Sequence, residues 1–238
     1  MRPNFTDNML EKLKNEVCQA NLDLVKEGLV VQTWGNVSGL DRAGGNMVIK
    51  PSGVSYDGMT PDQMVVVSLA TGQVVEGRLK PSSDTPTHLV LYRAFPEIGG
   101  ITHTHSLFAT AWAQARQPIP SFGTTHADHW HGDVPCTRLL TAAEIKADYE
   151  ANTGHVIVET IQQLEAAHHS AVLVASHGPF TWGRSARQSV ENAVVLEFVA
   201  RLALETLRLN PKLKPMQTVL LEKHFLRKHG PDAYYGQK

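Results

Sequence analysis

Two histidines separated by one residue, His103 and His105, are the strongest chemical signal in the sequence. They lie at the end of Gly99–Thr104, which is predicted to be a β-strand, and residues two apart in a strand point to the same face. Two adjacent imidazoles could bind zinc or another late first-row divalent metal. A polar strand face has the same spacing, so the pair alone leaves both interpretations open.

A metal site needs further ligands, and two other residues are candidates. His177 follows the apolar run Ala171–Ala175, and Asp84 precedes a predicted helix start. Three histidines and one carboxylate would make a site that can still open toward a substrate. Each candidate has an ordinary alternative, because His177 stands before Gly178-Pro179 as a turn residue would, and Asp is a favoured helix N-cap.

Three short segments offer hydrogen-bond donors to an anion: Gly35-Asn36, Lys50–Gly53 and Lys80–Ser83. They carry hydroxyl, amide or backbone N–H groups next to glycine or proline, and a helix N-terminus beside one of them would add a favourable dipole. The formal net charge is −1, so the positive charge for an anion must be local, from Lys50 or Lys80. Plain turns have the same composition, which leaves that alternative open.

The elements that must position these residues follow from hydrophobic periodicity and capping sequences. The predicted helices are Asn8–Glu27, Pro86–Ala94, Ser106–Ala115, Thr141–Leu164 with a possible break near Gly154, Ser185–Asn210 and Met216–Lys228. The predicted strands are Leu29–Val31, Asn36–Leu40, Met47–Ile49, Val65–Leu69, Gln73–Glu76, Gly99–Thr104 and Ala171–Ala175. Short strands flanked by helices predict an α/β sandwich with a mostly antiparallel or mixed sheet. No glycine-rich dinucleotide or P-loop motif follows a strand.

Composition narrows the class of protein further. A chain of 238 residues fits one domain, and 42% hydrophobic with 19% charged residues argues against disorder. The near-zero net charge provides no basic field for nucleic acid or an anionic membrane. Two cysteines without a CxxC pair, a polar N-terminus and the lack of a long apolar run predict a cytoplasmic protein with no membrane partner.

Taken in order, these segments resemble the class II aldolase/epimerase family over nearly the whole chain. The motifs that carry the resemblance are Thr33–Ser38, Ile49–Gly53, Lys80–His88, His103–His105, Gly123–Asp128, Ser176–Phe180, Lys223-His224 and Tyr234–Gln237. The resemblance implies one class II aldolase/epimerase domain over residues 1–238, folded as a three-layer sandwich. It also implies a C4 homotetramer in which the tail, about residues 229–238, reaches a neighbouring subunit.

The resemblance assigns roles to specific residues. It implies one zinc ion per subunit, held by Asp84, His103, His105 and His177. It implies a substrate phosphate held by Asn36, Ser52, Gly53, Ser82 and Ser83, with Lys50 close by. The implied acid/base pair is Asp128 and Tyr235, the tyrosine coming from a neighbouring subunit. Thr124, Glu150 and His224 are implied to support that site.

One position separates two activities in the family. Its aldolases carry Glu after the Ser-Ser pair and use it as the base, whereas its epimerases carry Asp, as at Asp84. This residue, Asp128 and the Tyr-Tyr-Gly-Gln tail favour an epimerase that interconverts L-ribulose 5-phosphate and D-xylulose 5-phosphate. Because C4 is not adjacent to the C2 carbonyl, retro-aldol cleavage of C3–C4 is the expected route rather than deprotonation at C4.

Two alternatives compete with this interpretation. One is an aldolase that releases its aldehyde, and the other is a non-catalytic interaction module on the same fold, as in the adducin head. A non-catalytic module would be expected to have lost the metal-ligating and phosphate-binding residues, but the candidate residues for both roles are all present. Ala175 departs from the family pattern, because similar sequences have histidine there, and this could alter metal affinity. The sequence does not distinguish an arabinose from an ascorbate pathway.

Overall fold

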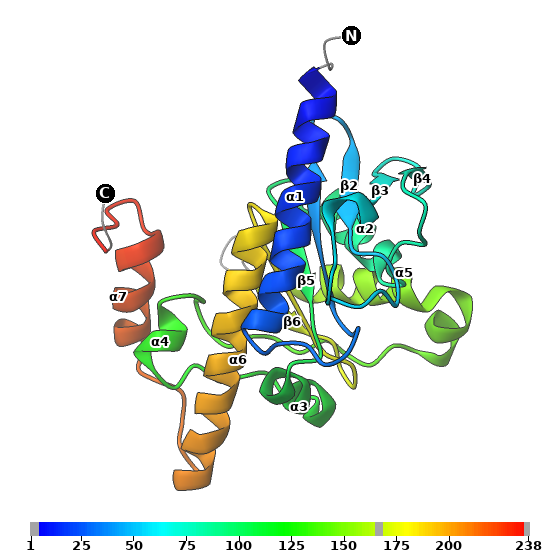
Figure 1. Ribbon diagram of the computed structural model, residues 1–238. Coiled ribbons are helices and arrows are strands. Elements are labelled where there is room, and N and C mark those ends of the chain that lie inside the picture. The colour runs from blue at the N-terminus through cyan, green and yellow to red at the C-terminus, as the bar shows by residue number, and fades with distance from the viewer. Residues whose placement is uncertain (1–4, 165–168, 236–238) are drawn as a thin grey trace.

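The structure, a computed structural model, describes residues 5–164 and 169–235 (Figure 1). Its centre is a seven-stranded sheet in the order β4-β3-β2-β1-β5-β7-β6. The strands are β1 (Asn36–Asp41), β2 (Asn46–Ile49), β3 (Val65–Ser68), β4 (Val74–Glu76), β5 (Gly100–His103), β6 (Ala171–Leu173) and β7 (Pro179–Gly183). Each pair of neighbouring strands is antiparallel, so the antiparallel prediction holds rather than the mixed one.

Apart from the exposed edge strand β4, the sheet is buried on both faces, and successive side chains along its strands point to opposite faces. In β2, Met47 and Ile49 face one core, whereas Val48 between them faces the other. In β3, Val65 and Val67 likewise point opposite to Val66. These apolar runs therefore require a helical layer on each side of the sheet.

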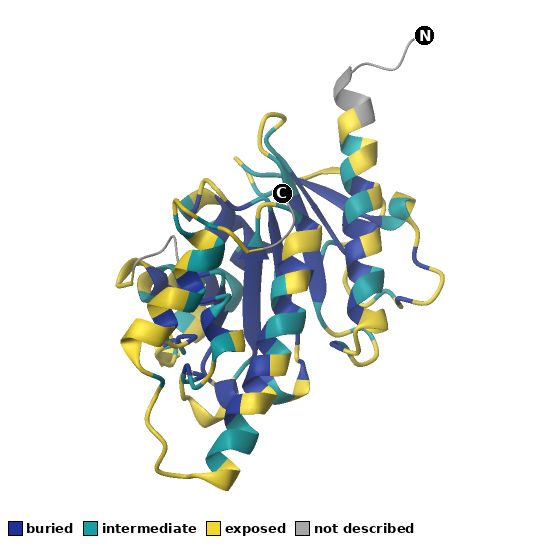
Figure 2. Ribbon diagram, turned by 90° about the vertical axis from the view of Figure 1, so that its left-hand side faces the viewer, coloured by how far each residue is buried: buried dark blue, intermediate teal, exposed yellow. Residues whose placement is uncertain are grey.

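The helices supply these two layers (Figure 1). On one face pack α2 (Thr85–Ala94) and α5 (Ala142–Gln162), and on the other pack α1 (Phe5–Lys26), α3 (Leu107–Ala115) and α6 (Ala186–Leu209). Figure 2 shows buried strands between helices that turn their exposed residues outward. The predicted three-layer α/β sandwich is confirmed.

Two further helices pack against each other beside these layers. They are the short α4 (Thr124–Ala127) and α7 (Thr218–His229), which lie side by side in Figure 1. A 3-10 turn, η1 (Pro61–Gln63), precedes β3. Among the described residues, no helix combines the length and apolar character needed to cross a membrane.

Most predicted elements are confirmed, and the exceptions have local causes. Leu29–Val31 is not a strand, because the chain after α1 runs through turns in which Gly28 and Gln32 have positive φ angles. The predictions missed β7, whose Pro179 start looks like a loop signal. The break in α5 falls at Asp148 rather than near Gly154. Residues 236–238 of the predicted tail lie outside the described residues.

Candidate active site

A cavity of about 600 Å³ opens at one end of the sheet. The register places it there, because Asn36 at the start of β1 pairs with His103 at the end of β5, which pairs with Phe180 in β7. Loops that leave or enter these strand ends therefore converge. The cavity is lined by Thr33, Trp34, Gly35, Asn36, Lys50, Pro51, Ser52, Gly53, Ser82, Ser83, Asp84, His103, His105, Tyr149, Glu150 and His177.

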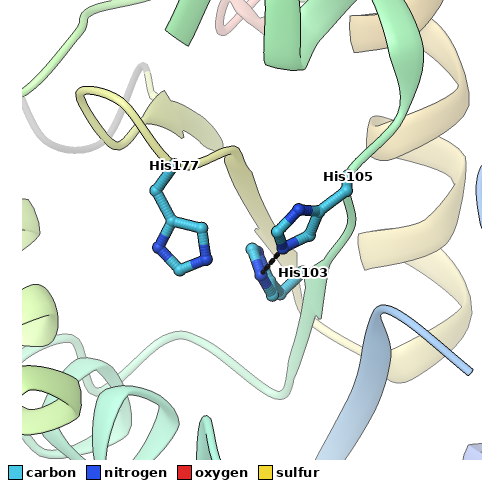
Figure 3. Close-up of side chains that lie close together, drawn as sticks. All are labelled: His103, His105 and His177. Atoms are coloured by element: carbon cyan, nitrogen blue, oxygen red, sulfur yellow. Dashed lines mark hydrogen bonds between the residues drawn. The ribbon is translucent and has the colours of Figure 1, made fainter. Parts of the chain in front are cut away.

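Three imidazoles meet in this cavity (Figure 3). His103 is buried, and its Nδ1 donates a hydrogen bond to the Pro179 carbonyl at 2.9 Å, so in the neutral imidazole tautomer that makes this bond Nε2 carries the lone pair. That Nε2 lies 3.1 Å from Nε2 of His105. Two nitrogens bound to one tetrahedral zinc are about 3.3 Å apart, given Zn–N bonds near 2.0–2.1 Å. The spacing therefore fits two ligands of one ion.

The prediction that His103 and His105 both lie in one strand is only partly confirmed. Strand β5 ends at His103, so His105 lies in the segment that leads into α3 rather than in the sheet. The backbone stays close to β7 for one more residue, because the Thr104 N–H donates to the Pro179 carbonyl at 3.4 Å. This keeps the two rings on the same side without regular strand geometry.

His177 completes the group from the turn between β6 and β7. Its ring centroid lies 4.8 Å from that of His103 and 5.1 Å from that of His105. The preceding Ser176 has φ of +62°, a left-handed conformation that is uncommon outside glycine. His177 can therefore be both a turn residue and a candidate metal ligand, because the turn directs its imidazole into the cavity.

Asp84 lies in the same cavity but outside the tight three-histidine group. It occupies the N-cap position of α2, yet its side chain makes no capping hydrogen bond. Its carboxylate instead accepts a hydrogen bond from Asn36 Nδ2 at 2.7 Å. Burial alone would raise the pKa of Asp84, but His103 and the Asn36 hydrogen bond lower it, so the pKa lies below its usual value. A charged carboxylate beside imidazoles suits a divalent cation.

The predicted anion-binding segments are brought together in the same cavity. The Ser52 N–H donates to the Lys80 carbonyl at 2.9 Å, and the Ser82 N–H donates to the Lys50 carbonyl at 3.0 Å. These reciprocal bonds hold both Pro-Ser loops side by side, with Ser52, Ser82 and Ser83 lining the cavity. Lys50 is buried, and burial lowers its pKa to about 8. Lys80 is not among the lining residues.

Asp128, Thr124, His224 and Tyr235 do not line this cavity. They lie at α4 and α7, where Asp128 accepts hydrogen bonds from His224 at 3.0 Å and Arg227 at 2.7 Å. Burial would raise the pKa of Asp128, but these two partners lower it. The tail also folds onto α7, because Tyr235 N–H donates to the Arg227 carbonyl at 3.1 Å.

Sequence reasoning missed Tyr149, which lines the cavity and contacts His177. No local pattern marks it, because its approach depends on the break in α5. Ala175 is buried, and its backbone N–H donates to Thr137 Oγ1 at 3.0 Å. Its methyl side chain therefore brings no ligand atom to the site.

The fold and the site together define an α/β sandwich with a three-imidazole site at one end of an antiparallel sheet. Residues 15–204 match the family described as Class II Aldolase and Adducin N-terminal domain. The chain belongs to this family, as the sequence motifs predicted.

Curated relatives and solved structures agree with this assignment. An L-ribulose-5-phosphate 4-epimerase UlaF from Salmonella paratyphi B is 56% identical over 229 residues, which are 96% of this chain and 100% of that protein. The protein of the same name from Salmonella typhi is also 56% identical over the same shares. A structure of an L-fuculose 1-phosphate aldolase has a TM-score of 0.75 and 25% identity, covering 90% of this chain and 94% of its own.

Proposed function

We propose that the chain is a zinc-dependent L-ribulose-5-phosphate 4-epimerase, which interconverts L-ribulose 5-phosphate and D-xylulose 5-phosphate. The observation that carries this proposal is one cavity lined by both three convergent imidazoles and two cross-bonded Pro-Ser loops. The full-length similarity to proteins named for this reaction supports it.

The donor set fits a zinc-like ion, because imidazole nitrogens and one carboxylate are common zinc ligands. Asp84, His103, His105 and His177 would hold one ion per subunit. When bound, the ion supplies Lewis acidity toward the C2 carbonyl and C3 hydroxyl oxygens of the sugar. The hydrogen bond from His103 Nδ1 to the Pro179 carbonyl prepares Nε2 for this role.

Further residues of the cavity fit the phosphate. We assign it to Asn36, Ser52, Gly53, Ser82 and Ser83, with Lys50 supplying the positive charge. Gly53 has φ of +66°, so its backbone adopts a conformation in which a side chain would be strained. The serine hydroxyls and backbone N–H groups bind the phosphate oxygens and keep the substrate in place through the reaction.

The reaction then needs proton transfer at the C4 oxygen. A base removes the C4 hydroxyl proton, the C3–C4 bond breaks, and its electron pair passes to the three-carbon fragment as an enediolate. Glycolaldehyde phosphate, held by its phosphate, rotates and is attacked on its other face, and an acid protonates the new C4 oxygen. Inversion calls for two proton-transfer groups, one that removes a proton and one that returns it, for which we propose Asp128 and Tyr235.

Cations lie next to the proposed tyrosine. The Tyr235 ring centroid is 4.7 Å from Arg227 Cζ and 4.6 Å from Lys228 Nζ. Thr124, Glu150 and His224 would support the reacting groups, with Glu150 doing so from the cavity wall and His224 through its bond to Asp128.

Asp128 and Tyr235 share a cluster that is not part of the cavity wall in the same chain. The resemblance implies that only the tyrosine comes from a neighbouring subunit. Because Asp128 is also absent from the cavity wall of its own chain, we propose that both residues complete the cavity of a neighbouring subunit in a C4 homotetramer. Residues 1–238 would then form one catalytic domain whose tail crosses the interface. A cytoplasmic enzyme of sugar-phosphate catabolism fits this proposal.

The test uses purified, metal-analysed protein with L-ribulose 5-phosphate. We expect D-xylulose 5-phosphate to form, the activity to disappear on chelation, and zinc to restore it. A trap for free glycolaldehyde phosphate separates the epimerase from an aldolase, because the proposed enzyme retains this fragment. Release of trapped aldehyde at a rate near turnover would favour the aldolase, and no xylulose phosphate from zinc-loaded protein would refute the substrate assignment.

A further inference from the structure

Tyr149 contacts a proposed metal ligand from outside the metal-binding group. Its hydroxyl lies 3.1 Å from Nδ1 of His177, and its ring centroid lies 6.1 Å from that imidazole with the planes 29° apart. Both residues line the cavity. We propose that Tyr149 is a positioning residue whose hydroxyl oxygen accepts a hydrogen bond from the Nδ1–H of His177 and thereby leaves Nε2 to face the metal. This inference rests on the proposed metal site.

A break in helix α5 places Tyr149 next to His177. Helix α5 is interrupted at Asp148, whose φ and ψ of −156° and 89° are not helical. The Asp148 carboxylate accepts a hydrogen bond from the Ala151 N–H at 3.1 Å, as an N-cap residue does three positions before its partner. Tyr149 is therefore the first residue of a new helical segment, and the break sets the direction of its side chain.

The direction of the hydrogen bond decides what the contact does. A neutral imidazole carries one proton, so its two nitrogens cannot both be free. If the Tyr149 O–H donated to Nδ1, the proton of His177 would sit on Nε2 and block it as a ligand. If Nδ1–H donates to the tyrosine oxygen, Nε2 has a free lone pair facing the other imidazoles. Metal binding through Nε2 selects the second arrangement.

The neighbouring candidate ligand, His103, has the same arrangement, in which Nδ1 donates a hydrogen bond and Nε2 faces the other imidazoles. His103 donates its Nδ1 proton to the Pro179 carbonyl, a backbone group that mutation cannot easily remove. At His177 the corresponding acceptor is a side chain. Tyr149→Phe therefore deletes one oxygen atom while retaining the ring and its packing against the imidazole.

The experiment measures metal affinity directly. Metal-free wild-type protein, Tyr149→Phe and Tyr92→Phe are titrated with Zn²⁺ against a chromophoric chelator, and with Co²⁺ while the visible absorption is recorded. Tyr92 is the matched control, because its buried hydroxyl bonds to Ser38 and does not line the cavity. We expect Tyr149→Phe to weaken metal binding about 10- to 100-fold and to alter the Co²⁺ spectrum. Tyr92→Phe should retain the wild-type affinity and spectrum, even if it unfolds at a lower temperature.

A second pair of variants tests the break in α5. Asp148→Asn retains a capping side chain and should keep wild-type metal affinity, whereas Asp148→Ala should weaken it in the same direction as Tyr149→Phe. Wild-type affinity in Tyr149→Phe, or an equal loss in Tyr92→Phe, would overturn the inference while leaving the proposed function intact. A wild-type protein that binds neither metal would overturn both.

Discussion

The three-histidine cavity and the Asp128 cluster are built in different ways. The cavity lies at one end of β1, β5 and β7, where the strand register places His103 and short segments next to the strands bring His105 and His177 beside it. The cluster lies on the short α4 and on α7, where Asp128 is held by Arg227 and His224. One region is positioned by the sheet, and the other by ion pairs near the chain's end.

This difference separates two functions that the family resemblance assigns together. The three imidazoles could bind a metal with little rearrangement, because their candidate ligand atoms already lie within 4.8 Å of one another. A cluster whose Tyr235 is exposed is suited to meet a second surface. The comparison predicts that substitutions in the cavity remove the metal, whereas substitutions in the cluster remove proton transfer and leave the metal in place.

The largest effect is expected for His103→Asn. Loss of a buried imidazole ligand should leave less than stoichiometric metal after purification and lower kcat by about 10³-fold or more, because the Lewis acid is lost. Metal content by emission spectroscopy and the epimerase assay measure both quantities. His155→Asn, on an exposed position of α5, is the control that should retain metal and activity. Full metal occupancy with full activity in His103→Asn would contradict the assigned cavity.

The next effect concerns Asp128→Asn. It removes a carboxylate but preserves its size, so we expect full metal occupancy and a fall in kcat of about 10²-fold, as for loss of a general acid or base. Asp232→Asn, an exposed residue after α7, should behave as wild type. Loss of metal from Asp128→Asn would break the proposed separation between the two regions.

A smaller, pH-dependent effect is expected at Lys50. Its pKa in the free protein is lowered to about 8 by burial, so the ammonium is charged below this pH and becomes neutral as the pH rises through it. Phosphate binding therefore weakens above pH 8, and kcat/KM should fall about fivefold from pH 8 to pH 9.

Lys50→Met tests the cause of this pH dependence, because it retains an unbranched side chain without the charge. We expect it to lower kcat/KM at pH 7 and to remove the decline near pH 8. A decline of the same size in Lys50→Met would assign it to another group.

The smallest effect is expected outside both regions. Thr141 caps α5 in a reciprocal pair with Glu144, whose carboxylate accepts from the Thr141 N–H at 2.7 Å. Thr141→Ala should lower the free energy of unfolding by about 1 kcal/mol, with metal content and kcat unchanged. Denaturant unfolding measures the first quantity. A large loss of metal would show that the cap affects the cavity through Tyr149.

The sequence predicted the regular parts of the molecule well. Periodicity and capping boxes identified the main helices, and Val65–Leu69 with Gln73–Glu76 was correctly predicted as a pair of neighbouring strands. Periodicity failed at β7, which begins at a proline, and at Leu29–Val31, where apolar residues line a turn. Local signals do not determine which segment finds a strand partner, because pairing is set by the whole sheet.

The candidate site was predictable from ordered motifs, although single motifs were ambiguous. The convergence of Asp84, His103 and His177 depends on how the start of α2, the end of β5 and the turn before β7 pack together, which no local pattern contains. Tyr149 was missed because its position depends on the non-helical backbone of Asp148. The separation of Asp128 from the cavity wall was likewise invisible in the sequence, since Gly123–Asp128 looks continuous with the other site motifs.

The most direct test of this account mixes two inactive variants in one assembly. His103→Asn retains the Asp128 cluster but lacks a metal ligand, and Asp128→Asn with Tyr235→Phe retains the cavity but lacks the acid/base pair. Co-expressed and co-purified through two different tags, they should recover about a quarter of wild-type activity in mixed tetramers, because one subunit then completes its neighbour's site. Mixed tetramers that stay as inactive as their parents would contradict a site shared between subunits.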